Sequence, residues 1–336
     1  MAGHNKPPQD FTLSPVEFAD IGQPNFEDPN KPSDTNKKIA ERLRVLDRRE
    51  LLLCAGQFAC MAASESQPVA DFKEIPAFGE GRERSRHGVT FGRLNVQTEQ
   101  DPVITTFVAM KPYDRRKVDL GMRPERAVTH DWATNQHLRK LSTSGAYEPI
   151  GVWRNHDTFF VPGLITWFNE RSLSLDNMLQ ARTDEDGLMD AATPLRARQA
   201  LRLGHFGLGI AHGAHITHGD AFPQNFATDG SHIIFNDTTT LRPFGSSETT
   251  TRTKVDQDVD DFVSGTIHPE MSSPEMQALT SEALKDSEFR TDLYESYMAG
   301  AALGAERAGY PKSGLLVPPS THQQIIDRVV QRYVPR

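Results

Sequence analysis

Apolar and polar positions change their spacing along the chain, and the changes mark out segments of different structure. Residues 1–35 carry six prolines among Asn, Asp and Gln. Such a segment cannot bury enough apolar surface to order itself, so we expect a disordered or draped arm. Apolar residues then recur at helical spacing through Ile39, Leu43 and Leu46, and a capping group is present in Asp34, Thr35 or Asn36. This predicts a helical N-terminal extension over 36–66.

The spacing becomes that of short strands after Val69. Runs at 69–77, 89–96 and 103–110 are separated by turns rich in glycine and charge, which predicts an antiparallel meander. A helix over 123–141 follows, and two more strands are expected at 150–154 and 158–167. The predicted buried face of this helix comprises Val128, Trp132, Leu138 and Leu141. We therefore assign 67–168 to a small β-rich lobe.

The remainder of the chain, 169–336, has mostly helical spacing. Helices are expected at 174–181, at 195–211 and beyond Asp256, with a hairpin at 225–228 and 232–236 as the exception. A small antiparallel β-rich lobe followed by a larger helical lobe is an α+β, two-lobed architecture with a cleft between the lobes.

Composition and charge narrow the class of protein. The 336 residues are 37% hydrophobic and 24% charged, with a net charge of -8. This acidity argues against nucleic acid as the main partner. No apolar run approaches the length of a membrane span, and the N-terminal segment lacks the apolar core of a signal peptide. We expect a cytoplasmic protein whose Cys54 and Cys60 are buried thiols, since their spacing is not that of zinc ligands.

The strongest chemical signal is the segment His218-Gly219-Asp220, followed by Asn225 and, after the predicted hairpin, by Asp237. Phosphoryl transfer from Mg-ATP needs a carboxylate that orients the acceptor hydroxyl and two oxygen ligands for the metal. We predict that Asp220 orients and deprotonates the acceptor. Asn225 and Asp237 would hold Mg²⁺. Each residue alone is ordinary loop material, but the ordered set indicates this chemistry.

Three further groups would bind the nucleotide. Lys111 ends the third predicted strand, from which a lysine can reach phosphates. Its acidic partner would come from the next helix, where Asp131 is favoured over Glu125 and both remain open. Gly79 and Gly81 lie between the first two strands and would let backbone amides approach the phosphates.

Two other interpretations of residues 204–218, as a metal site or a dinucleotide site, have less support from the sequence. Four histidines, His205, His212, His215 and His218, suggest a metal cluster, but no carboxylate-histidine motif frames them and their spacing crosses a helix end. His218 is expected to brace the loop. Gly204, Gly207 and Gly209 suggest a dinucleotide fingerprint, but they lie within a helix instead of between a strand and a helix.

On these residues the chain resembles the protein-kinase-like superfamily, of the aminoglycoside phosphotransferase and choline kinase type. The resemblance covers roughly 69–267 and rests on the 218–220 loop with Asn225 and Asp237. It implies a bilobal protein-kinase-like fold, ATP, magnesium and transfer of the γ-phosphoryl group to a hydroxyl. It also implies that Asp260 or Asp261 supports the catalytic loop and that 164–168 contacts adenine.

The chain departs from the protein kinases in ways that favour a small-molecule acceptor. Thr238 follows Asp237, Gly219 stands where protein kinases place Arg, and no clear glycine-rich loop or Ala-Pro-Glu element is present. Helices after Ser273 would build the acceptor pocket, with Glu282, Asp286 or Glu288 as acidic candidates. Two alternatives stay open: a non-catalytic kinase-fold scaffold, and a protein serine/threonine kinase. A protein partner could bind through the N-terminal arm.

Overall fold

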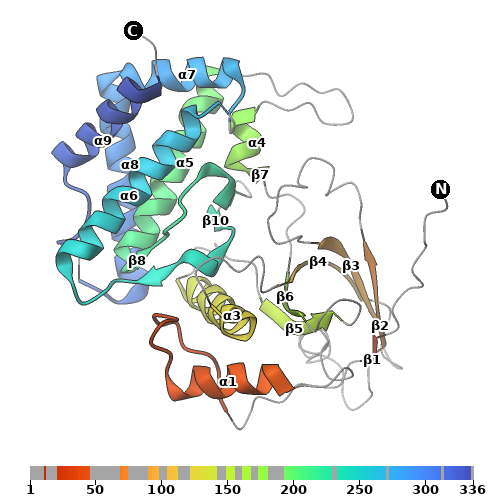
Figure 1. Ribbon diagram of the computed structural model, residues 1–336. Helices are drawn as coiled ribbons and strands as arrows, with labels where there is room; N and C mark the ends of the chain where they lie inside the picture. The colour runs from red at the N-terminus through yellow and green to blue at the C-terminus, as the bar shows by residue number, and fades with distance from the viewer. Residues whose placement is uncertain are drawn as a thin grey trace. The chain divides into compact units, whose positions relative to one another are not determined.

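Two structural units make up the chain in the computed structural model (Figure 1), and each is described by itself. Unit 1 comprises Met1–Gln136 and Tyr147–Glu170, and unit 2 comprises His137–Ala146 and Arg171–Arg336. The structure describes residues 11–12, 21–45, 69–74, 90–97, 104–112, 122–141, 149–155, 161–167, 173–180, 193–228, 233–269, 272–311 and 314–333. Both cysteines, Gly79, Gly81 and the part of the predicted helical extension beyond Val45 lie outside these residues.

Unit 1 contains an antiparallel six-stranded sheet in the order β1-β2-β3-β4-β6-β5. Its strands are β1 (Phe11–Thr12), β2 (Val69–Glu74), β3 (Thr90–Gln97), β4 (Ile104–Pro112), β5 (Pro149–Asn155) and β6 (Val161–Trp167). The five strands predicted from alternation are confirmed. The sheet is not a simple meander throughout, because β4 pairs with β6 and β5 pairs on the far side of β6. The additional strand β1 arises from the predicted arm and pairs with β2.

Helix α3 (Pro124–Lys140) follows the first four strands and confirms the predicted helix. Proline at its first position suits a helix start, where no intrahelical N–H bond is lost. Val128, Trp132, Leu138 and Leu141 are all buried, as their spacing predicts. Each residue from 127 to 135 is buried, so this stretch is covered on every side.

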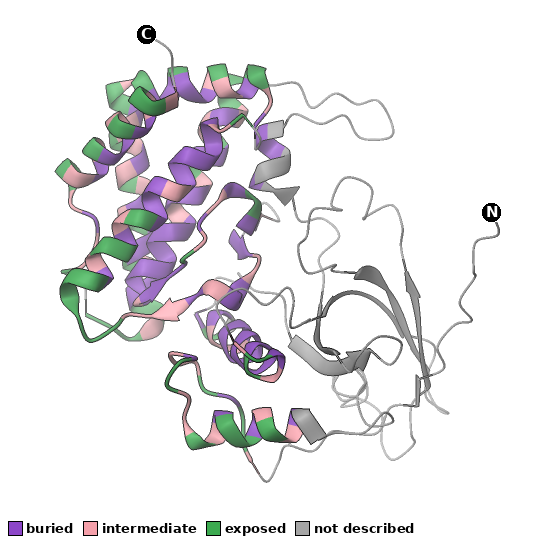
Figure 2. Ribbon diagram, viewed as in Figure 1, coloured by how far each residue is buried: buried purple, intermediate pink, exposed green. Residues whose placement is uncertain are grey.

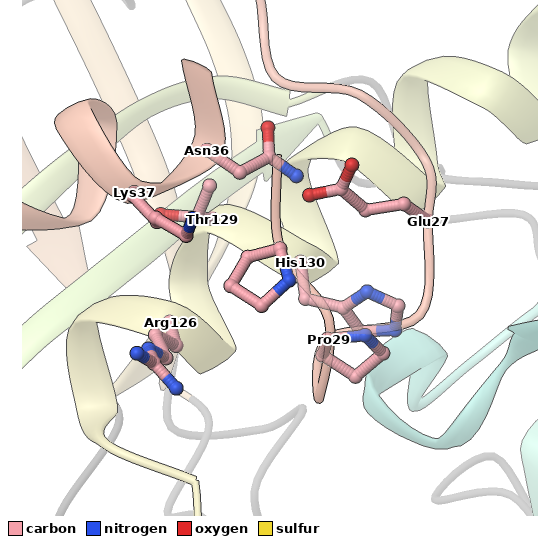
Figure 3. Close-up of a pocket in the computed structure, with 8 residues that line it drawn as sticks. Glu27, Pro29, Asn36, Lys37, Arg126, Thr129 and His130 are labelled. Carbon is pink, nitrogen blue, oxygen red and sulfur yellow. The ribbon is translucent and has the colours of Figure 1, made fainter. Parts of the chain in front are cut away.

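The described part of the N-terminal arm runs along α1 (Asp34–Val45) and α3 within unit 1. Asn25 and Asn36 exchange two hydrogen bonds of 2.8 Å between side chain and backbone. The Phe26 ring stacks on His130 of α3 with a centroid separation of 6.1 Å. Figure 3 shows Asn36 and His130 beside a small cavity that the arm and both helices line. Residues 21–33 are therefore draped on the helices.

Unit 2 is mostly helical. Its helices are α4 (Leu175–Gln180), α5 (Pro194–Gly213), α6 (Glu248–Ile267), α7 (Pro274–Lys285), α8 (Ser287–Ala308) and α9 (Pro319–Tyr333). Its short strands are β7 (Leu173–Ser174), β8 (Ile216–Thr217), β9 (Phe226–Thr228), β10 (Ile233–Phe235) and β11 (Arg242–Pro243), and two 3₁₀ turns cover Pro223–Asn225 and Thr238–Thr240. Thr193, Ser247, Ser273 and Asp286 cap helices α5 to α8 through side-chain oxygens.

Helix α5 is the centre of the unit 2 core, and most of it is buried (Figure 2). It packs closely against α8 because glycines face backbone at the crossing. A Cβ at Gly209 would lie 2.0 Å from the carbonyl oxygen of Tyr297, and one at Gly304 would lie 2.1 Å from that of Ile210. Gly213 and Gly300 repeat these close approaches. Of the three glycines predicted to lie inside a helix, Gly209 lies at this crossing, Gly204 faces Phe262 of α6, and Gly207 faces Ile233 of β10.

None of the described helices combines the length and the apolar character that a membrane-crossing helix requires.

Candidate active site

The candidate catalytic loop, residues 218–225, is anchored at its start by a short antiparallel pair. Strand β8 follows α5 and pairs with β11, with Thr217 opposite Arg242. Gly219 then adopts a φ of 77°, a left-handed conformation that glycine reaches without the Cβ penalty. A Cβ at this position would also lie 3.1 Å from the carbonyl oxygen of Thr240. This backbone explains why glycine precedes Asp220.

A buried carboxylate on α6 holds the first residues of the loop. Asp258 is 1% exposed. Its Oδ2 accepts a hydrogen bond from the amide N–H of His218, and its Oδ1 accepts one from that of Gly219, each at 2.7 Å. His212 Nε2 lies 3.0 Å from Asp258 Oδ2 as well. A carboxylate that bonds to consecutive amides fixes the direction in which the chain enters the loop.

The prediction that Asp260 or Asp261 supports the loop is wrong. Asp260 accepts a hydrogen bond from Arg328 Nη2 at 2.9 Å and so belongs to the contact of α6 with α9. Asp261 accepts one from Gln257 Nε2 at 2.6 Å, and burial raises the pKa of Asp261 to about 6. Side chains two and three positions further along a helix are turned by about 160° and 60° from the first, and the carboxylate that bonds to the loop amides is that of Asp258.

Asn225 fixes the orientation of the Asp220 side chain. Its Nδ2 donates to the backbone oxygen of Asp220 at 2.7 Å and to the carboxylate Oδ2 at 2.9 Å. Asn225 is 6% exposed, and it ends the 3₁₀ turn that begins at Pro223. The structure thus brings together two of the residues to which the sequence assigns catalysis.

The β9–β10 hairpin places Asp237 beside this pair. Phe226 is opposite Phe235 in the ladder, and the Asn236 amide N–H donates to the carbonyl oxygen of Asn225 at 2.8 Å. Asp237, the next residue, has a φ of 48°, which Asp tolerates better than most residues. The predicted hairpin is confirmed, and its register brings the segments of the two predicted metal ligands together.

His218 braces the loop from inside the core. Its ring is fully buried and lies 5.0 Å from the Phe226 ring and 6.1 Å from the Phe235 ring, centroid to centroid. Burial lowers the pKa of His218, so the ring is held neutral. Neither ring nitrogen has a hydrogen-bond partner. Its contribution is apolar packing under the loop.

The residues predicted to bind the nucleotide lie in unit 1. Lys111 lies near the end of β4, with its backbone opposite Leu164 of β6. Asp131 is 1% exposed on α3, whereas Glu125 lies half-buried in the first turn of that helix. Whether either acid pairs with Lys111 stays a prediction. The predicted adenine contact over 164–168 is described only as far as Trp167, as backbone of β6.

The remaining candidates from the sequence have other partners. The four histidines diverge: His205 and His212 point from α5 to different neighbours, and His215 stacks between Phe244 and Tyr310. Among the described residues no group of three or more His, Cys, Asp or Glu side chains is arranged to hold a metal. Asp286, proposed for the acceptor pocket, caps α8 and pairs with Arg198 at 2.7 Å.

The hollows found within each unit differ in size. The cavity that the arm, α1 and α3 line measures about 20 Å³, room for a single water molecule. In unit 2, a polar groove of about 240 Å³ lies between α6 and α9, lined by residues that include Asp256, Gln324 and Arg328. Neither hollow includes the 218–225 loop.

Comparison with known proteins assigns no family. No family model matches the chain, and no curated protein does. Among solved structures, the Drosophila melanogaster PAN3 pseudokinase is similar at 11% sequence identity and a TM-score of 0.32. The match covers 72% of this chain and 64% of the pseudokinase chain, which is less than two thirds of the latter. Similarity at this level does not establish a shared activity.

Proposed function

We propose that this chain is an ATP-dependent phosphotransferase that transfers the γ-phosphoryl group to a hydroxyl group of a small molecule. Asp220 orients the acceptor hydroxyl and takes its proton. Asn225 and Asp237 hold Mg²⁺, and Lys111 binds phosphate oxygens with Asp131 as its partner. Gly79 and Gly81 belong to the loop that covers the phosphates.

The observation that carries the proposal is the double hydrogen bond from Asn225 Nδ2 to Asp220, at 2.7 and 2.9 Å. A general base must present its carboxylate in a defined direction, because a small misplacement of a reacting group costs much of the rate. Asn225 limits rotation of the Asp220 side chain, and Asp258 holds the backbone before it. Together these bonds restrain the Asp220 carboxylate and the backbone that leads to it, as a positioned general base requires.

The residues near Asp220 also suit a magnesium ion. Mg²⁺ prefers oxygen ligands and keeps several waters or phosphate oxygens in its shell. Both bonds from Asn225 to Asp220 use the amide nitrogen and leave Oδ1 for a metal. Asp237 supplies a carboxylate on the adjoining hairpin. When bound, the ion would neutralise charge that develops on the transferred phosphoryl group.

One contact favours a second candidate, a kinase-fold protein that binds a nucleotide without transferring phosphate. Asp237 Oδ1 accepts a hydrogen bond of 2.8 Å from the Thr239 hydroxyl. This bond engages one carboxylate oxygen that a catalytic metal would otherwise use. The two candidates share the fold and differ in whether phosphate is transferred.

The first test is thermal unfolding with and without Mg-ATP, for the wild-type chain, Asp237→Ala and the surface control Asp292→Ala. A ligand at a hundred times its Kd stabilises the folded state by about 2.7 kcal/mol. We expect this stabilisation in the wild type and in the control, where only an exposed ion pair to Arg202 is lost. We expect it to disappear in Asp237→Ala. No magnesium-dependent shift in the wild type would refute the nucleotide site.

The second test separates the enzyme from the binding protein. Radiolabelled ATP is offered with a panel of hydroxylated small molecules, and with a protein mixture as an alternative acceptor. We expect wild-type transfer to a small molecule, loss of transfer in Asp220→Ala, and retained nucleotide stabilisation in that variant. Nucleotide binding with no transfer to any acceptor would favour the second candidate, and a labelled protein band would favour a protein kinase.

A further inference from the structure

A buried chain of hydrogen bonds connects helix α8 to the candidate catalytic loop through two other helices. Tyr297 of α8 is fully buried, and its hydroxyl lies 2.9 Å from His212 Nδ1 on α5. The opposite ring nitrogen, His212 Nε2, lies 3.0 Å from Asp258 Oδ2 on α6. Asp258 then accepts the amide bonds from His218 and Gly219. Figure 1 shows α5, α6 and α8 packed together in unit 2.

The direction of these bonds follows from the groups at the two ends of the chain. The Val317 amide N–H can only donate, and it points to the Tyr297 hydroxyl oxygen at 3.3 Å. At the other end the Asp258 carboxylate can only accept, so His212 Nε2 donates to it. A neutral ring then accepts at Nδ1, and the Tyr297 hydroxyl hydrogen donates there. Burial raises the pKa of Tyr297 well above its ordinary value, so the hydroxyl keeps this hydrogen.

Because Nδ1 of His212 accepts a hydrogen bond, the ring proton lies on Nε2: a neutral imidazole has one donor and one acceptor nitrogen. Nε2–H then donates to Asp258 Oδ2, which also accepts from the His218 amide. Every member of the chain is matched, donor to acceptor. The opposite tautomer would set the lone pair of Nε2 against the carboxylate.

We propose that Tyr297 is a positioning residue for the candidate catalytic loop: its hydroxyl donates to His212 Nδ1 and holds the ring in the orientation in which Nε2–H aligns Asp258 with the loop amides. The positioning of the loop by Tyr297 is argued from these contacts, and its effect on turnover rests on the proposed function. Tyr297 does not touch Asp220; it acts through His212 and Asp258.

The packing of α5 on α8 makes this link stiff. A Cβ at Gly209 would lie 2.0 Å from the Tyr297 carbonyl oxygen, so backbone meets backbone one turn away from the His212 contact. The Tyr297 and His212 rings lie 5.7 Å apart, centroid to centroid. A rigid helix contact of this kind holds the hydroxyl in place, as alignment of a supporting residue requires.

Nitrogen NMR of the histidine rings in the wild-type chain tests the direction of the bonds. We expect His212 to be neutral, with a proton on Nε2 and none on Nδ1. A proton on Nδ1, either as the other tautomer or as an imidazolium, would overturn the proposal. This measurement needs no variant, so a Tyr297→Phe protein that failed to fold would not remove the test.

Hydrogen exchange in Tyr297→Phe tests the positioning effect, with Tyr294→Phe as the matched control on the same helix. We expect the Gly219 amide to exchange about tenfold faster in Tyr297→Phe (about 1.4 kcal/mol of local opening) and unchanged in Tyr294→Phe. The Leu293 amide within α8 should change much less. Equal acceleration at Gly219 and Leu293 would reveal general destabilisation and overturn the proposal, as would an unchanged Gly219 rate.

Turnover supplies the functional readout. We expect kcat to fall about tenfold in Tyr297→Phe with the KM for ATP unchanged, since the hydrogen-bond partners of the hydroxyl among the described residues are His212 and Val317. A raised KM with an unchanged kcat would refute the link to catalysis. Exchange and ring NMR need no turnover. A wild-type chain that transfers no phosphate would therefore refute the proposed function and leave the test of Tyr297 intact.

Discussion

Replacing Gly304 by alanine tests the close packing at the centre of unit 2. The Cβ of the new side chain would lie 2.1 Å from the carbonyl oxygen of Ile210, a separation that real Cβ atoms do not adopt. Neither helix backbone can move locally, because both atoms involved belong to regular turns of α5 and α8. The helices must therefore separate by about 1 Å at this point to reach ordinary contact.

The magnitude follows from two opposing effects. A gap of about 1 Å forfeits a quarter to a half of the dispersion attraction of the facing atoms, and overpacking of this kind costs about 1–3 kcal/mol or more. Alanine regains about 1 kcal/mol because it is a better helix former than glycine. Since the clash involves backbone and not a side chain that could rotate away, we expect the cost to win and the net loss to be about 2 kcal/mol.

Urea denaturation followed by far-ultraviolet circular dichroism is the suitable assay, because the three tryptophans lie in unit 1 whereas most described helical residues lie in unit 2. The control is Gly314→Ala, where a Cβ would meet nothing within 4 Å. We expect that variant to be neutral or more stable by about 0.5 kcal/mol. A Gly304→Ala protein as stable as the control would refute the packing argument.

Three further predictions concern acid stability and the loop. Burial lowers the pKa of His205 to about 4 and that of His322 to about 3, from an ordinary value of 6.5. Below pH 6.5 the unfolded chain therefore binds more protons than the folded chain. The contribution of the two histidines to the free energy of unfolding is complete above pH 6.5 and falls by up to about 1.4 kcal/mol per pH unit per histidine as the pH drops toward 4. Urea denaturation midpoints from pH 7.5 to 4.5 measure this loss. Gly219→Ala should lose about 1–2 kcal/mol in thermal unfolding, because alanine is strained at a φ of 77°. Asp258→Asn should lower the free energy of unfolding by about 2–4 kcal/mol in urea denaturation. The asparagine side chain has one acceptor oxygen in place of two, and the charge of the acceptor is removed.

Each of these has a control or a contrary outcome. A His205→Leu, His322→Leu double variant should flatten the dependence of the urea midpoint on pH, whereas His268→Gln at the end of α6 should not. An unchanged slope in the double variant would assign the acid sensitivity to other groups. For the loop, Gly245→Ala is the matched glycine control, because its nearest neighbour atom is 3.9 Å away and its φ is not positive. Equal losses at Gly219 and Gly245 would contradict the strain argument. Asp292→Asn, which affects only an exposed ion pair, should leave stability within about 1 kcal/mol of the wild type.

The sequence by itself determined the elements and their local order. Period-2 runs became the strands of the unit 1 sheet, and the apolar residues Val128 and Trp132 that the spacing marked on α3 are buried. The hairpin between Asn225 and Asp237 was also predictable, because turn residues and short apolar runs act over a few positions. These elements form between residues that are close in sequence, so the spacing of apolar and turn residues is enough to predict them.

Only the tertiary structure decided which acid on α6 supports the loop. Asp258, Asp260 and Asp261 are equivalent by composition, and the helix begins at Glu248, eight residues before the predicted start. Which of them faces the loop depends on the rotation of α6 about its axis, which its contacts with α5 and α9 set. A one-residue difference in phase turns a side chain by about 100°, so local patterns cannot choose among neighbours.

The glycines and histidines also show that local sequence patterns do not determine which distant residues meet. A pattern of two small residues four positions apart, Gly209 with Gly213 and Gly300 with Gly304, was present in the sequence and signals close helix packing. The sequence could not say that these two pairs meet, nor that Tyr297 would thereby reach His212 across 85 positions. Contacts of that range depend on how all the helices pack at once, and a hydrogen bond exists only where packing brings donor and acceptor within about 3 Å.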